Sequence, residues 1–196
     1  MVRNDEPGDD LLLSVAGRLF GRLGYDSVTN TMIAEAAGVD LAEVTERYGG
    51  KRDIYMAVLQ RAHWRRINRI RAIEAVYTPD LDGLILLLDE YLDLCMETPE
   101  LGALWMQRWL SDASDIPRLD DMFGGPELGR TINLFRRAIA DDLDAGMVMR
   151  TFAYTILAFS QKGIVDTSGV RHEPTEPATL RRFRAHLHQL ARHLVA

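Results

Sequence analysis

The sequence predicts an all-α protein of about nine helices, and three observations support that prediction. Residues that cap or end helices recur along the whole chain. Apolar residues recur at helical spacing, and no convincing alternating strand pattern competes with them. The 196 residues are 47% apolar and 27% charged, a composition that buries a core and excludes a chain that is disordered throughout.

Three short helices are expected within the first 50 residues, each bounded by a capping residue and a glycine. Short polar side chains cap helix N-termini by accepting a backbone hydrogen bond, and glycine ends helices because it readily adopts the left-handed conformation. The predicted boundaries are Asp9 or Asp10 with Gly24 for the first helix, Thr29 with Gly38 for the second, and a capping box of Asp40 and Glu43 with Gly49-Gly50 for the third.

Six further helices are expected after residue 50. The first, from about 52 to 77, is ended by Pro79 and connects an N-terminal domain (1–50) with a larger domain (51–196). The prolines of Thr98-Pro99 and Gly125-Pro126 suit the first position of a helix. Of the other three helices, one carries the acidic row Asp89, Asp93 and Glu97, and a second runs from Asp144 to about Lys162. The third occupies about 178–194 and follows the polar linker 173–177.

Residues 19–51 have the pattern of a helix-turn-helix. Small and apolar side chains lie where two helices must approach closely, and Gly38 supplies the left-handed turn between them. Alanine at the close contact and glycine in the turn are steric requirements, so the spacing is a strong signal. The apolar positions are Ile33, Ala34 and Ala37 on the first helix of the motif, then Val39, Val44 and Tyr48.

At these residues the sequence resembles the TetR family of transcriptional regulators. The resemblance covers residues 12–59 in motif, and residues 60–196 only in length and helix order. It implies a homodimer whose N-terminal domains bind a palindromic operator in double-stranded DNA, and a C-terminal domain that holds a small molecule. We therefore expect a ligand-responsive repressor that a small apolar or aromatic effector releases from DNA.

The resemblance also implies a set of DNA contacts on the second and third helices. The third helix departs from the family pattern, since Leu41 replaces a lysine, Glu43 a small hydroxyl residue and Thr45 a tyrosine. Residues 1–50 carry four arginines against nine Asp or Glu, a net charge of −5 that is unusual for a DNA-binding surface. The alternative is a TetR-like protein that binds a ligand or a protein partner and has lost sequence-specific DNA binding. The predicted DNA-binding residues are Thr29, Asn30, Thr31, Leu41, Ala42, Glu43, Thr45, Arg47, Tyr48 and Lys51.

Aromatic and methionine side chains concentrate after residue 90. Such side chains line adaptable apolar pockets, although each could also pack in a core. The predicted effector-binding residues are Tyr91, Trp105, Met106, Trp109, Phe135 and Phe152.

Two C-terminal helices carry more apolar surface than one small bundle covers. Residues 147–159 have apolar side chains on nearly every side of the helix, and the final helix repeats leucine and phenylalanine at spacings of three and four. Both features predict the interface of a homodimer, with completion of the monomer core as the alternative. The predicted interface residues are Phe152, Ile156, Phe159, Phe183, Leu187, Leu190 and Leu194.

A basic row lies on the helix expected from about 52 to 77. It consists of Arg61, Arg65, Arg66, Arg69 and Arg71, and the acidic row follows within 30 residues. Because the far end of the basic row is roughly 30 Å along the helix from Lys51, we expect it to form ion pairs with the acidic row rather than contacts with DNA.

Other classes of function lack sequence support. The single cysteine, Cys95, excludes an internal disulfide and a cysteine zinc site, and His186 and His193 share a helix face with arginines rather than with carboxylates. No nucleophile elbow, phosphate-binding glycine loop or helical metal motif occurs, so we expect no enzyme activity, no cofactor and no metal. No signal layout or apolar run of about 20 residues is present, which predicts a cytoplasmic protein without membrane attachment.

Overall fold

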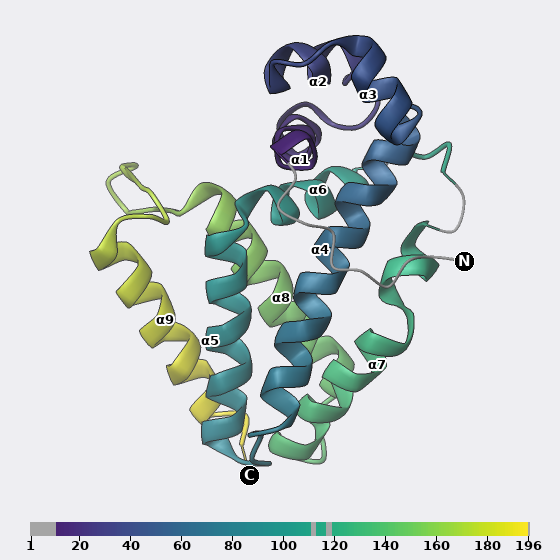
Figure 1. Ribbon diagram of the computed structural model, residues 1–196. Helices are drawn as coiled ribbons and strands as arrows, with labels where there is room; N and C mark the ends of the chain where they lie inside the picture. The colour runs from purple at the N-terminus through teal and green to yellow at the C-terminus, as the bar shows by residue number, and fades with distance from the viewer. Residues whose placement is uncertain (1–10, 111–112, 117–118, 196) are drawn as a thin grey trace. The chain divides into compact units, whose positions relative to one another are not determined.

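The computed structural model describes residues 11–110, 113–116 and 119–195, and the predicted all-α fold is confirmed there. These residues form nine helices and one hairpin of two short strands (Figure 1). The chain divides into two compact units, each taking up two stretches of sequence. Unit 1 holds the residues up to Arg66 and those from Glu100 to Phe123, and unit 2 holds 67–99 and 124–196.

Unit 1 is formed around three short helices and the first part of a long one. These are α1 (Leu11–Leu23), α2 (Asn30–Ala37), α3 (Leu41–Tyr48) and the start of α4 (Lys51–Glu74), with most of α6 (Pro99–Trp109). The rings of Phe20, Tyr25 and Tyr55 meet in the core, where the centroids of Phe20 and Tyr55 are 5.0 Å apart in an edge-to-face arrangement. Such aromatic pairs add stability beyond the apolar area that they bury.

The helix boundaries of unit 1 follow most of the predicted caps. Thr29 accepts a hydrogen bond from the Met32 backbone N–H at 3.2 Å, and Gly38 ends α2 in the left-handed conformation with φ of 70°. The capping box is wrong, because the Asp40 side chain makes no capping hydrogen bond. Asp40 is exposed, so water can solvate its carboxylate instead. The predicted cap of the first helix, Asp9 or Asp10, lies outside the described residues.

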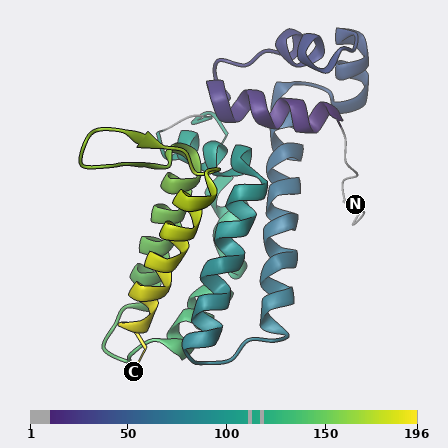
Figure 2. The ribbon, with the colours of Figure 1, turned by 90° about the vertical axis from the view of Figure 1, so that its left-hand side faces the viewer.

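Unit 2 is a helical bundle with α5 (Leu81–Glu97) between α8 (Ala145–Lys162) and α9 (Pro177–Arg192). Figure 1 and Figure 2 both show α5 running alongside α9, the last helix of the chain. The end of α4 and most of α7 (Leu119–Ala138) complete the unit. Asp144 caps α8 by accepting hydrogen bonds from the backbone N–H groups of Gly146 and Met147, as predicted.

Three features of the fold differ from the sequence-based expectation. The helix α4 ends at Glu74, before residue 77, and α7 begins at Leu119 rather than at Gly125-Pro126. Pro126 therefore lies inside α7. The φ angle of proline is close to the helical value, so the helix can continue through Pro126, although proline has no N–H and one backbone hydrogen bond is lost. The strands β1 (Ile164–Val165) and β2 (Arg171–His172) pair antiparallel, and two residues each are too short for an alternating pattern to show.

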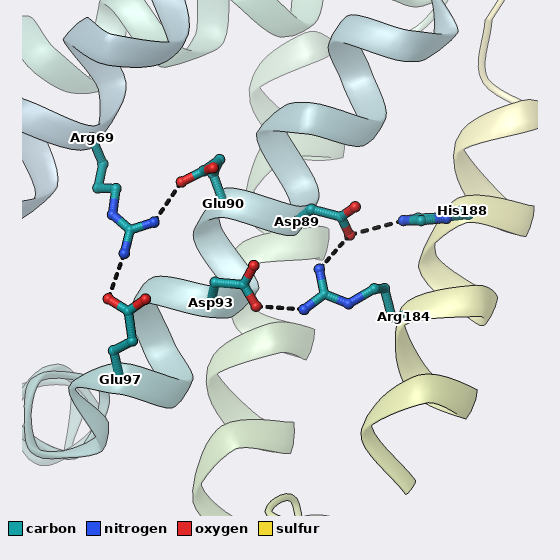
Figure 3. Close-up of polar contacts among 7 residues, drawn as sticks. All are labelled: Arg69, Asp89, Glu90, Asp93, Glu97, Arg184 and His188. Carbon is teal, nitrogen blue, oxygen red and sulfur yellow. Dashed lines mark hydrogen bonds and ion pairs between the residues drawn. The ribbon is translucent and has the colours of Figure 1, made fainter. Parts of the chain in front are cut away.

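Acidic side chains of α5 form ion pairs on both sides of that helix (Figure 3). Arg69 of α4 binds Glu90, with 2.5 Å between Nη1 and Oε2, and also binds Glu97. The pairing of the basic row with the acidic row is therefore confirmed for Arg69.

The other two members of the acidic row have different partners. Arg184 of α9 binds Asp89 at 2.8 Å and also binds Asp93, while His188 Nε2 lies 2.8 Å from Asp89 Oδ1. The expectation that these two aspartates pair with the basic row is wrong, because α9 covers that side of α5. At the other end of the basic row, Arg61 is 5% exposed and donates to the Ser14 hydroxyl within unit 1.

Candidate DNA-binding helix-turn-helix

The α2 and α3 helices are joined by a short turn and anchored in the core of unit 1. Ile33 and Ala34 of α2 and Val44 of α3 are at most 3% exposed, and Gly38 donates to the carbonyls of Ala34 and Glu35 at the turn. Glycine adopts this left-handed turn without strain, which an L side chain would not. The two helices therefore hold a fixed geometry that leaves most of α3 outside the core.

The outer surface of α3 is open to solvent. Val44 is its one buried residue, and Leu41 is 46% exposed although it is apolar. Ala42, Glu43 and Thr45 are exposed as well. A short exposed helix that follows a helix-turn is the arrangement that proteins insert into the major groove of DNA.

The predicted DNA-binding residues at the start of α2, which are Thr29, Asn30 and Thr31, differ in their contacts and exposure. The Thr29 hydroxyl caps the helix, and Thr31 is exposed. Asn30 is half-buried, and its buried Oδ1 accepts no hydrogen bond from any described residue. The free backbone N–H groups of a helix N-terminus and nearby hydroxyls are groups that bind phosphate.

Lys51 holds a loop of its own unit. Its Nζ donates to the Tyr25 carbonyl at 2.9 Å and to the Asp26 carbonyl at 3.3 Å, and lies 4.3 Å from the centroid of the Tyr25 ring. An ammonium group has three donors, so one donor remains for a phosphate. No local sequence pattern indicates this contact, since 26 positions separate Lys51 from Tyr25.

Two arginines place cations in the last turn of α3 and the first turn of α4. The Arg47 guanidinium lies 5.6 Å from the centroid of the Tyr48 ring, a cation–π arrangement that orients it. Arg52 is exposed in the first turn of α4; it is not among the DNA contacts that the sequence predicts, although it directly follows Lys51. Both arginines can reach solvent beside the motif.

Acidic side chains dominate the rest of the α3 surface. Asp40, Glu43 and Glu46 are all exposed. The carboxylates of Glu43 and Glu46 form no hydrogen bond or ion pair with any residue that the structure describes. They repel phosphates, so α3 can approach DNA only where its cations and a favourable base contact compensate.

The predicted effector-binding residues are divided between the two units. In unit 2, Phe135 and Phe152 are buried with their ring centroids 6.3 Å apart, and Tyr91 is half-buried next to the same core. In unit 1, Trp105 packs against the core, while Trp109 is 50% exposed. Met106, also in unit 1, is half-buried. The effector site itself stays a prediction.

Most of the predicted dimer-interface residues lie in the core of the single chain, where α8 and α9 pack on α5. The rings of Phe159 and Phe183, for example, stack with their centroids 3.8 Å apart. Side chains that fill the core of the single chain have almost no surface left for a second subunit, which favours the alternative, completion of the monomer core, for the buried ones. The dimer interface itself stays a prediction. Those at most 8% exposed are Phe152, Ile156, Phe159, Phe183 and Leu187, whereas Leu190 is 40% exposed and Leu194 half-buried.

The outward faces of α8 and α9 still carry apolar groups. Met147 and Tyr154 of α8 are 60% and 50% exposed. A dimer interface made by these helices would therefore use Met147, Tyr154 and Leu190 rather than the buried seam.

Other kinds of site find no support in the described part of the chain. No group of three or more His, Cys, Asp or Glu among the described residues could hold a metal ion. None of the described helices is long and apolar enough to cross a bilayer. Burial raises the pKa of the Cys95 thiol to about 12, so this cysteine is not a nucleophile at neutral pH.

Comparison with known proteins gives structural neighbours only. No protein-family model and no curated protein matches the sequence. The ketosteroid transcriptional regulator KstR2 of Mycobacterium tuberculosis has a similar structure, with a TM-score of 0.74, 16% identity, and 94% of this chain and 93% of that chain covered. The fatty acid degradation regulator FadR of Bacillus halodurans gives a TM-score of 0.69 at 15% identity, with 96% of both chains covered.

A third neighbour carries the name of the family that the sequence resembles. It is a TetR-like transcriptional regulator from Rhodococcus sp. RHA1, with a TM-score of 0.63, 16% identity, and 92% of this chain and 91% of that chain covered. At such identities a structural likeness establishes the fold, because function depends on particular residues. The chain therefore has the fold of the TetR-like transcriptional regulators.

Proposed function

We propose that the protein is a dimeric transcriptional repressor that binds a palindromic operator in double-stranded DNA through α2 and α3. The observation that carries this proposal is α3 itself, which is anchored by Val44 and exposed on its other sides. A short helix that is held by one buried residue and open on its other sides can enter the major groove of DNA.

Regulation by a small apolar or aromatic effector forms the second part of the proposal. Two of the neighbours named above are described as a ketosteroid transcriptional regulator and a fatty acid degradation regulator, which supports an apolar effector for this chain. The effector would bind within residues 51–196 and lower the affinity for DNA by favouring a dimer with a different spacing of the two α3 helices. Half-sites about 34–36 Å apart, or a multiple of that distance, fit a two-fold dimer on B-DNA.

Such a repressor acts in the cytoplasm, where it meets chromosomal DNA, and is a binding protein rather than an enzyme. It requires no cofactor. The two-fold dimer would use the outward groups of α8 and α9, among them Tyr154 and Leu190.

The test is a fluorescence-anisotropy titration of the full chain against the intergenic DNA upstream of its own gene. We expect binding that resists unlabelled random DNA and weakens steeply with salt. Arg47→Ala should reduce affinity and lower the slope of log K against log[salt] by about one, because one phosphate contact is lost. Arg71→Ala is the matched control, since Arg71 is an exposed arginine in unit 2.

Effector release is measured on the same complex. Addition of a long-chain fatty acid or a ketosteroid should lower the anisotropy if either compound belongs to the effector class. Absence of any DNA binding, even at low salt, by a folded wild-type dimer would overturn the repressor proposal and support a protein that keeps the fold without reading DNA.

A further inference from the structure

The position of Val44 defines which side of α3 faces away from the protein. Successive residues of an α-helix are about 100° apart, so Ala42 and Glu46 lie within about 20° of the direction opposite Val44. Glu43 lies about 80° to one side of that direction by the same count. Ala42 and Glu46 are therefore the centre of the outward face, and both are exposed.

Few groups on this face are available to bind a base edge. The Thr45 hydroxyl donates to the Leu41 carbonyl at 2.9 Å, and the Arg47 guanidinium lies over the Tyr48 ring. The Glu46 carboxylate has no hydrogen-bond or ion-pair partner among the residues that the structure describes. A carboxylate only accepts hydrogen bonds, so Glu46 needs a donor from whatever it meets.

We propose that Glu46 accepts a hydrogen bond from the N4 amino group of a cytosine in the major groove, and that Ala42 contacts a thymine methyl group beside it. This inference rests on the proposed function and names the bases that α3 reads. Cytosine N4 and adenine N6 are the amino donors of the major groove, but adenine presents its N7 acceptor next to N6, which repels a carboxylate. Cytosine has no acceptor there.

The spacing of the two residues limits the half-site. Four residues of helix rise about 6 Å, and base pairs are stacked about 3.4 Å apart. The cytosine and the thymine should thus lie within about two base pairs of each other in each half-site.

The negative charge of α3 also affects discrimination. A carboxylate that faces a base without an amino donor gains no hydrogen bond and still repels phosphate. Such a helix binds wrong sequences weakly, so the ratio of specific to non-specific affinity rises although the absolute affinity falls.

The experiment selects binding sites from a random duplex library with the full-length chain and with two variants. We expect the wild type to enrich cytosine at one position of each half-site. Glu46→Gln should move that position toward adenine, because an amide pairs with adenine N6 and N7 together. Glu43→Gln makes the same charge change on the same helix; it should raise the affinity for all sequences and keep the cytosine.

A second measurement isolates the amino group. In the best selected duplex, the cytosine is replaced by 2-pyrimidinone, which lacks the N4 amino group and still pairs with guanine. Wild-type affinity should fall about 10- to 150-fold, the range for loss of one hydrogen bond to a charged group. The Glu46→Ala variant should bind both duplexes within about twofold, and thermal melting of every variant shows that it is folded.

The outcomes separate this inference from the proposed function. If no sequence is enriched by any folded variant, the DNA-binding proposal fails and this inference fails with it. If a sequence is enriched but Glu46→Gln keeps the wild-type cytosine, or if Glu43→Gln changes the base instead, the assignment of Glu46 is wrong and DNA binding stands.

Discussion

Replacing Arg184 by methionine tests whether its ion pairs hold α9 on α5. The guanidinium binds Asp89 at 2.8 Å and also binds Asp93, and the three side chains are 26%, 26% and 44% exposed, respectively. Ion pairs of this exposure contribute about 0.2–1 kcal/mol each, so both together amount to about 0.5–2 kcal/mol. Asp89 keeps His188 as a partner at 2.8 Å, and the more exposed Asp93 is rehydrated.

We therefore expect Arg184→Met to lower the free energy of unfolding by about 1 kcal/mol, which is about 2–4 °C in Tm for a chain of this size. The assay is thermal unfolding followed by circular dichroism at low salt and at 1 M salt. The loss should shrink at high salt, where the Debye length is about 3 Å.

Arg181→Met provides the matched control, because Arg181 is an exposed arginine of the same helix with no ion pair to any described residue. A double-mutant cycle with Asp93→Asn isolates the pair energy. An equal loss at both salt concentrations, or the same loss in the control, would refute an electrostatic origin. A loss above about 3 kcal/mol would also refute it, since exposed pairs do not supply that much.

Three further predictions concern single side chains. Lys51→Met should destabilise the loop that Lys51 holds at the Tyr25 carbonyl by about 1–2 kcal/mol. Hydrogen exchange of the loop amides should become faster, and an unchanged exchange rate would contradict this. The thiol of Cys95, whose pKa burial raises to about 12, should react with a thiol reagent at pH 8 only as fast as the chain unfolds, and rapid labelling under native conditions would count against burial. The hydrogen bond that the His172 ring donates to the Asp166 carboxylate raises the pKa of His172, so this contact should support the hairpin fully below about pH 6.5 and be lost as pH rises through the raised pKa. A titration of the His172 ring by NMR checks the direction, with Asp166→Asn as control; a pKa below the ordinary value would show the contact to be absent in solution.

Local geometry accounts for the parts of the fold that could be predicted from sequence. Thr29 caps its own helix three residues on, and Gly38 ends the same helix, so both depend on a few neighbouring positions. The helix-turn-helix was predicted for the same reason. The contact between Lys51 and the Tyr25 carbonyl could not be predicted, because it depends on how α1 and α4 pack.

The buried seam of α9 shows a different limit of sequence patterns. Leucine and phenylalanine at spacings of three and four indicate that α9 packs against another helix, but not which chain supplies that helix. In the structure, Phe183 and Leu187 pack in the core of the same chain. Arg184 and His188, each next to one of them in sequence, both bind Asp89 of α5. The charges were visible in the sequence; pairing Asp89 with Arg184 required knowing that α5 and α9 are neighbours.

The division of the chain into two units also determines what its intrinsic fluorescence reports. All three tryptophans, Trp64, Trp105 and Trp109, belong to unit 1, whereas helices of both units contribute to the ellipticity. Tryptophan emission and circular dichroism therefore follow different parts of the molecule during unfolding, and separate midpoints would mean that the units unfold independently. A compound that binds only in unit 2 and yet changes the emission would reveal energetic coupling between the units without any label on the protein.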